Sequence, residues 1–198
     1  MDSKPEAANM DMKNSMCGVI LCGGKSQRFG SDKALVVYEG ESLVHRAYGA
    51  LTAIASEIVI AAGPSGRSYK MNAPHIHDLR EDAGPLAGIE AAFAATTAET
   101  LLVLATDLPL ISSEHLQAIV NGYRQPLTIA RDEMTKREQP LCALWHRTLE
   151  EPLTAYLDAG HRSVMGFVHT QPFFSVDVMG GRLQNVNYSH DLPASNGK

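Results

Sequence analysis

A short apolar run that ends in a glycine-rich, basic loop is the feature that most constrains this chain. Residues 19–22 (VILC) are followed directly by Gly23 and Gly24, which predicts a buried strand running into a loop. Adjacent glycines let the backbone approach an anion closely, and the nearby Arg28 and Lys33 can reach phosphate oxygens. The stretch therefore predicts a phosphate site, with a glycine turn flanked by solvated basic residues as the alternative.

The loop matches neither of the common phosphate fingerprints. A Walker A loop has the pattern G-x-x-x-x-G-K-[ST], and here Gly24 stands where the lysine belongs. The dinucleotide pattern G-x-G-x-x-G is also absent, because Gly23 and Gly24 are adjacent. The phosphate site is thus of another type.

Strand-like and helix-like segments alternate along the chain. Predicted helices cover residues 42–54, 89–95, 113–123 and 148–159, and predicted strands cover 57–62, 101–105, 127–130 and 141–145. This alternation predicts an α/β fold with three layers and a mainly parallel sheet. The run LLVLA at 101–105 is expected to be a central strand that is buried on both faces.

Asp107 follows that central strand directly, in the sequence TDLP at 106–109. Ligands of open α/β sheets bind at the carboxyl ends of the strands. A carboxylate there is well placed to hold a divalent cation beside phosphates. Taken alone, Asp107 could equally be a turn or helix-cap residue.

Composition narrows the class of partner and the compartment. With 198 residues and a net charge of −5, the chain offers no global attraction for nucleic acid or an anionic membrane. Three cysteines without C-x-x-C spacing indicate buried thiols in a reducing compartment, and no apolar run is long enough to span a membrane, so a cytoplasmic protein is expected. Residues 1–16 are polar and are expected to form a disordered leader before a single domain at 17–198.

The pattern LCGGKSQRFGSDKAL at residues 21–35 resembles the molybdenum cofactor guanylyltransferases and their nucleotidyltransferase relatives. The resemblance continues through DLREDAGPLAG (78–88), ATDLP (105–109), QPLCALWH (139–146), YLDAGHRSV (156–164) and NVNYSHDL (185–192). It implies a Rossmann-like nucleotidyltransferase fold of the glycosyltransferase-A type. It also implies Mg²⁺-dependent transfer of GMP from GTP to molybdopterin, with release of pyrophosphate.

The same resemblance implies roles for single residues. Leu21, Cys22 and Gly23 would line the nucleotide, and the backbone of Gly23 and Gly24 would cradle the triphosphate. The charged positions would be Lys33 on the phosphates, Asp78 at the nucleoside, Asp107 on Mg²⁺ and Arg28 on the leaving pyrophosphate. The expected partners are GTP, molybdopterin and other proteins of molybdenum cofactor synthesis or delivery.

Three further residues are candidates for the acceptor or metal site. Asn185 and Asn187 alternate around a valine, so both amides can face one side of an extended segment, although a turn is the alternative. Arg162 follows a glycine and a histidine, and would suit a pterin phosphate or begin a solvated helix.

Two other functions stay open for this chain: a relative that uses CTP or a sugar-phosphate acceptor, and a non-catalytic nucleotide-binding protein.

Overall fold

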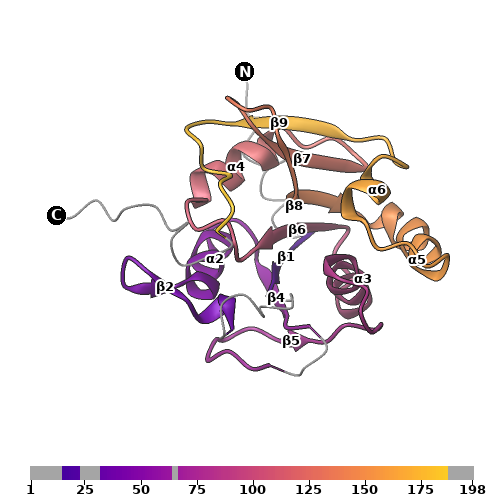
Figure 1. Cartoon of the computed structure of the whole chain (residues 1–198), viewed down its shortest axis with the longest axis horizontal. Helices are drawn as coiled ribbons and strands as arrows, with labels where there is room; N and C mark the ends of the chain where they lie inside the picture. The colour runs from indigo at the N-terminus through magenta and orange to yellow at the C-terminus, as the bar shows by residue number, and fades with distance from the viewer. Residues whose placement is uncertain (1–14, 23–31, 64–66, 187–198) are drawn as a thin grey trace, which may run out of the picture.

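A seven-stranded sheet organises the computed structural model, which describes residues 15–22, 32–63 and 67–186 (Figure 1). The strands lie in the order β5-β4-β1-β6-β8-β7-β9. β8 runs antiparallel to its neighbours β6 and β7, and the other pairings are parallel. The strand bounds are β1 Met16–Leu21, β4 Glu57–Ala61, β5 His75–Ile76, β6 Thr100–Ala105, β7 Leu127–Asp132, β8 Glu138–His146 and β9 Phe174–Val178. The predicted mainly parallel sheet is confirmed.

β6 is the central strand that the sequence predicted. It lies between β1 and β8, and all six of its residues are buried. An uninterrupted apolar run is what a strand needs when both of its faces are covered. Because β1 pairs with it in parallel register, Leu21 at the end of β1 lies opposite Ala105 at the end of β6.

Helices cover both faces of the sheet, which confirms the three layers (Figure 1). The helices α2 (Leu43–Thr52) and α4 (Ser113–Asn121) pack on one face with sheet residues such as Ile20. The helices α3 (Pro85–Ala95), α5 (Glu150–Asp158) and α6 (Val164–Val168) pack on the other face with residues such as Val19 and Leu21. Successive residues of β1 thus enter opposite cores, as the period of a strand requires.

α3 begins four residues before the predicted start at residue 89. Pro85 occupies its first turn, where the missing N–H of proline would have had no helical partner. Gly84 precedes it with φ +66°, a backbone conformation that side chains disfavour. The segment GPLAG therefore starts the helix instead of preceding it. None of the helices in the described ranges is long and apolar enough to cross a membrane.

Several elements were missed or misplaced by periodicity. The missed elements are short: η1 (Lys33–Leu35), β2 (Val37–Tyr38), β3 (Glu41–Ser42), η2 (Arg147–Leu149), β5, α6 and β9. β8 begins at Glu138, three residues before its predicted start, and α5 begins after η2. β1 begins at Met16, one residue inside the expected leader, because Met16 is buried and pairs with Thr100.

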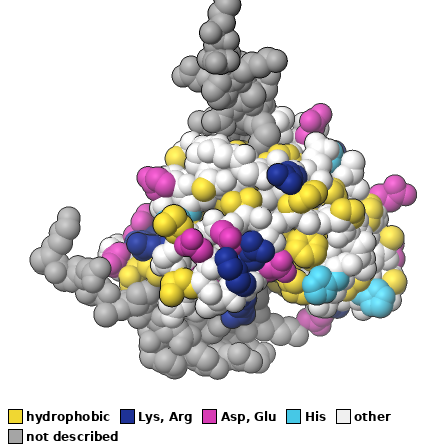
Figure 2. Space-filling model, turned by 90° about the horizontal axis from the view of Figure 1, so that it is seen from above, with side chains coloured by type: hydrophobic (Ala, Val, Ile, Leu, Met, Phe, Trp, Pro, Cys, Tyr) yellow, Lys and Arg dark blue, Asp and Glu magenta, His cyan; other side chains and the backbone are white. Residues whose placement is uncertain are grey.

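The edge strand β9 is flanked by paired charges. Arg131 and Lys136 both form ion pairs with Asp177 of β9, at 2.6 and 3.2 Å. Figure 2 views the molecule from the β9 end and shows Lys and Arg side chains next to Asp and Glu side chains on this face. Charged groups at a sheet edge oppose pairing with a further strand.

Candidate active site

The candidate site is built where β1 and β6 end. The backbone N–H of Thr106 donates to the Leu21 carbonyl at 3.3 Å, and the N–H of Cys22 donates to the Ala61 carbonyl at 3.0 Å. β1 and β6 therefore end side by side at the same edge of the sheet. This edge is the one at which open α/β sheets bind ligands.

Lys33 and Asp107 meet at this edge, although they are 74 residues apart. The ammonium of Lys33, on η1, lies 3.5 Å from Oδ2 of Asp107. Both side chains are mostly buried, with 18% and 22% of their surfaces exposed. Limited access of water strengthens the interaction of these charges with each other and with any anion placed beside them.

The last described segment of the chain closes over Asp107. The Val186 N–H donates to the Asp107 carbonyl at 2.9 Å, and the Asn185 amide donates to Asp107 Oδ2 at 3.0 Å. The amide of Gln139, in β8, donates to the Leu183 carbonyl at 2.9 Å and to Asn185 Oδ1. Gln139 thus fixes the Asn185 amide with its nitrogen toward Asp107, so Asn185 orients the carboxylate, and a role of Asn185 toward a metal or an acceptor stays a prediction.

One oxygen of Asp107 has no hydrogen-bond partner among the described residues. Both the lysine and the asparagine contact Oδ2, whereas Oδ1 is buried and accepts no hydrogen bond from the described residues. Buried carboxylate oxygens are rarely left unsatisfied, so this atom fits a cation. The described residues contain no group of three or more His, Cys, Asp or Glu that could hold a metal. Mg²⁺ commonly takes several of its oxygen ligands from phosphates and water, so a cation at Oδ1 would fit beside a phosphate-bearing substrate.

Asp78 lies beside Leu21 and the first turns of α3. A Cβ atom added at Gly88 would lie 3.0 Å from Leu21 Cδ2 and 3.7 Å from Asp78 Oδ1. Burial raises the pKa of Asp78, and the neighbouring His77 opposes that rise. The aspartate is thus a partly desolvated acceptor at the end of β1, a position that suits a ligand contact.

The segment that carries Asp78 is held in place by Arg80. Its guanidinium donates to both carboxylate oxygens of Glu90 on α3, with the Nε to Oε2 bond at 2.8 Å. It also donates to Asp158, at the end of α5, at 2.5 Å. No pattern of the sequence indicated a role for Arg80 or Gln139. Each is a polar or charged residue inside a segment that carries the family resemblance, and only this position could have indicated its role.

Other predicted residues lie outside this group or outside the described ranges. Gly23, Gly24, Arg28 and Asn187 belong to stretches that the structure does not describe, so their predicted roles are untested. The guanidinium of Arg162 donates to the Leu157 carbonyl at 2.8 Å and to the His161 carbonyl at 2.7 Å, which caps the end of α5. The role of Arg162 toward an acceptor stays a prediction.

Cys22 is buried, and burial is the main cause that raises its thiol pKa to about 12.

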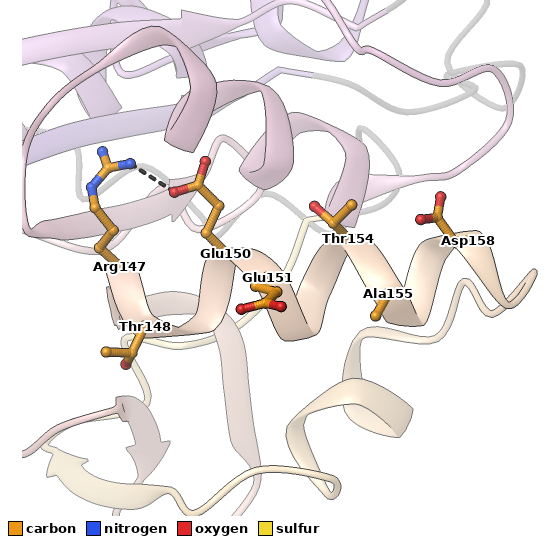
Figure 3. A pocket seen from close by; sticks show the side chains of 7 residues that line it. All are labelled: Arg147, Thr148, Glu150, Glu151, Thr154, Ala155 and Asp158. Carbon is orange, nitrogen blue, oxygen red and sulfur yellow. Dashed lines mark hydrogen bonds and ion pairs between the residues drawn. The ribbon is translucent and has the colours of Figure 1, made fainter.

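A groove along η2 and α5 is a separate feature. Figure 3 shows that its walls come from η2 and α5, with Arg147 and Glu150 joined by an ion pair of 2.8 Å at one end. The lining side chains are Arg147, Thr148, Glu150, Glu151, Thr154, Ala155 and Asp158. It contains neither Lys33 nor Asp107, so it is distinct from the candidate site.

Known proteins are similar to this chain in both sequence and fold. The family described as MobA-like NTP transferase domain matches residues 18–172. The molybdenum cofactor guanylyltransferase of Histophilus somni (strain 129Pt) is 33% identical over 192 residues, which cover 91% of this chain and 96% of that protein. The crystal structure of molybdopterin-guanine dinucleotide biosynthesis protein A from Archaeoglobus fulgidus has a TM-score of 0.71 at 21% identity, with 89% and 95% of the two chains covered.

A second structure adds a metal complex to these comparisons. The crystal structure of a Mycobacterium tuberculosis H37Rv protein in complex with manganese has a TM-score of 0.68 at 18% identity and covers 89% of this chain and 95% of that one. At these identities the two structures establish the fold, and the family match together with the Histophilus relative establishes the class. The chain belongs to the MobA-like NTP transferase family and is a nucleotidyltransferase of the molybdenum cofactor guanylyltransferase type.

Proposed function

We propose that this enzyme transfers GMP from GTP to the terminal phosphate of molybdopterin, which yields the guanine dinucleotide cofactor and pyrophosphate. The observation that carries the proposal is Asp107, whose buried Oδ1 has no partner in the described residues while Oδ2 faces Lys33. This arrangement suits a metal-bound nucleoside triphosphate at the ends of β1 and β6. The name of the Histophilus relative supports guanylyl transfer as the reaction.

The chemistry needs little covalent help from the protein. An oxygen of the molybdopterin phosphate attacks the α-phosphorus of GTP, and a new P–O bond forms as the bond to the bridging α–β oxygen breaks. Pyrophosphate leaves with that oxygen. The attacking phosphate is already anionic at neutral pH, so no general base is required, and positioning together with charge neutralisation supplies the catalysis.

Each residue of the site then has a definable task. Lys33 places positive charge against the phosphates as negative charge moves to the leaving group, and Asn185 holds the Asp107 carboxylate in one orientation. Asp107 Oδ1 would hold Mg²⁺, which when bound supplies positive charge to the phosphate oxygens. The manganese complex of the mycobacterial structure supports a divalent cation at this fold. Asp78 and Leu21 would contact the nucleoside, and Gly23, Gly24 and Arg28 the triphosphate.

The proposal extends to the setting of the enzyme. Three free and buried cysteines fit a protein that works in the reducing cytoplasm. Residues 17–198 would form a single catalytic domain, and proteins of molybdenum cofactor synthesis or delivery would exchange the acceptor and product with it.

A competition assay tests the reaction and the base together. The enzyme is incubated with Mg²⁺, purified molybdopterin and equal concentrations of GTP, ATP and CTP, and the dinucleotide products are separated and counted. We expect GTP to be preferred at least roughly tenfold, about 1.4 kcal/mol, because guanine alone among them offers the N1 and N2 donors together to backbone acceptors. A dominant CTP product would move the enzyme to cytidylyl transfer, and no nucleotide transfer to molybdopterin would refute the proposed acceptor.

A further inference from the structure

We propose that Tyr69 is a positioning residue for Lys33, acting through Asp32; the inference rests on the proposed function, in which Lys33 contacts the phosphates of the nucleotide. The hydroxyl of Tyr69 donates to Oδ2 of Asp32 at 2.9 Å, across 37 residues of sequence. Asp32 is the residue that begins the single turn carrying Lys33.

The turn that carries Lys33 depends on its cap. η1 is three residues long, and such short helices are marginal without tertiary support. Asp32 Oδ1 accepts a hydrogen bond from the Ala34 N–H at 3.1 Å, which fixes the start of the turn. The orientation of the Asp32 carboxylate therefore sets the direction in which Lys33 leaves the backbone.

Both oxygens of that carboxylate are held from another part of the chain. Besides the Tyr69 hydroxyl on Oδ2, the guanidinium of Arg67 lies 3.6 Å from Oδ1. Tyr69 and Arg67 belong to the connection between β4 and β5, so this connection clamps the cap of η1. Arg67 is one-third exposed and its ion pair is long, which makes the buried Tyr69 the firmer of the two contacts.

Tyr69 is itself fixed in one place. Its side chain is 3% exposed, its backbone N–H donates to His75 Nε2 at 2.9 Å, and its ring stacks on that histidine with centroids 5.8 Å apart. Burial is the main cause that raises the pKa of the phenol, so the hydroxyl keeps its proton and stays a donor. The Tyr69 hydroxyl is thus a rigid hydrogen-bond donor that holds the Asp32 carboxylate in one orientation. Through this cap it positions the start of η1 and the ammonium of Lys33.

The chain offers a matched pair of conservative variants. Tyr69→Phe removes the hydroxyl that holds Asp32 and leaves the ring in place. Tyr123→Phe is the control, because its hydroxyl also makes a side-chain hydrogen bond, to Thr100 at 3.2 Å at the start of β6, whereas the Asp107 that contacts Lys33 follows the other end of that strand. Asp32→Asn is a second variant that weakens the same link from the other side.

A substrate-free measurement tests the link directly. The lysines of the full chain are reductively methylated with ¹³C-formaldehyde, and the methyl signal of Lys33 is assigned by its loss in Lys33→Arg. We expect Tyr69→Phe and Asp32→Asn to move this signal toward those of exposed lysines, and Tyr123→Phe to leave it in place. A Lys33 signal that is unchanged in both Tyr69→Phe and Asp32→Asn would overturn the inference.

A double-mutant cycle then separates positioning from a general structural effect. We expect Tyr69→Phe to lower kcat/KM for GTP about tenfold in the wild-type background and less than about twofold in Lys33→Ala, because the residue acts through the lysine. Equal losses in both backgrounds would overturn the inference. If the wild-type enzyme transfers no GMP while the Lys33 signal responds to Tyr69→Phe, the proposed function fails and the positioning role stands.

Discussion

The substitution Gly88→Ala tests how closely α3 packs against the ends of β1 and β4. The new Cβ would lie 3.0 Å from Leu21 Cδ2 and 3.2 Å from Ala61 Cβ. The leucine methyl can move, but the Cβ of Ala61 is fixed to the backbone of β4. Something must therefore shift by a few tenths of an ångström, either the helix or the end of β1.

Two opposing effects set the magnitude. Replacing glycine by alanine inside a helix is worth about 0.5–1 kcal/mol in stability. Overpacking a dense core costs about 1–3 kcal/mol. Overpacking is the larger of the two, so we expect Gly88→Ala to be less stable than the wild type by up to about 2 kcal/mol. Because Leu21 and Asp78 lie against the same glycine, KM for GTP should also rise several-fold.

Gly49→Ala is the matched control. Gly49 lies inside α2, is exposed, and has no atom within 4 Å of its added Cβ. This variant should gain only the stability that alanine adds over glycine inside a helix. Its Tm should exceed that of Gly88→Ala by at least about 2 °C. Thermal unfolding and steady-state kinetics of both variants decide the matter. If Gly88→Ala is as stable as Gly49→Ala and its KM is unchanged, the packing of α3 against β1 and β4 described above is refuted.

Three further predictions concern the site lysine and the thiols. Lys33→Ala should lower kcat about a hundredfold to a thousandfold, as expected when one preorganised charge is lost, whereas a change in KM alone would mean that Lys33 binds substrate and transition state equally. Burial raises the pKa of Cys17, Cys22 and Cys142 to about 12, so Ellman's reagent at pH 8 should label none of them until denaturant is added. Since unfolded thiols ionise near pH 9 and the folded ones keep their protons, the free energy of unfolding should fall as the pH rises from about 9 toward 12. Rapid labelling of the folded enzyme would contradict this picture of the core.

The layers of the fold could be predicted because buried strands and helix faces consist largely of apolar residues. The continuous apolar run of β6 indicated a strand covered on both faces, and the structure places it at the centre of the sheet. β9 could not be predicted in the same way. It is an edge strand in which Phe174 is 38% exposed, and its pairing with β7 depends on segments far apart in sequence.

The candidate site was predictable to the extent that it lies at strand ends. Asp107 follows a predicted strand, and Lys33 was predicted as a phosphate ligand from the basic loop. The structure brings the two side chains together. The residues that hold these two in place were not predictable. Gln139 acts through Asn185, and Tyr69 acts through Asp32, so their importance depends on long-range contacts that no local pattern encodes.

Asp107 Oδ1 is proposed to hold the divalent cation of the reaction, and Asp107→Asn is the decisive variant for this role. The amide keeps the shape of the side chain and removes its charge, while Glu151→Gln, in the groove along α5, is the control. Thermal unfolding first establishes that the fold is kept. Binding of Mn²⁺ with GTP is then followed by electron paramagnetic resonance, together with Mg²⁺-dependent GMP transfer. We predict that Asp107→Asn loses both while Glu151→Gln keeps both; full metal binding and full turnover in a folded Asp107→Asn enzyme would contradict the account.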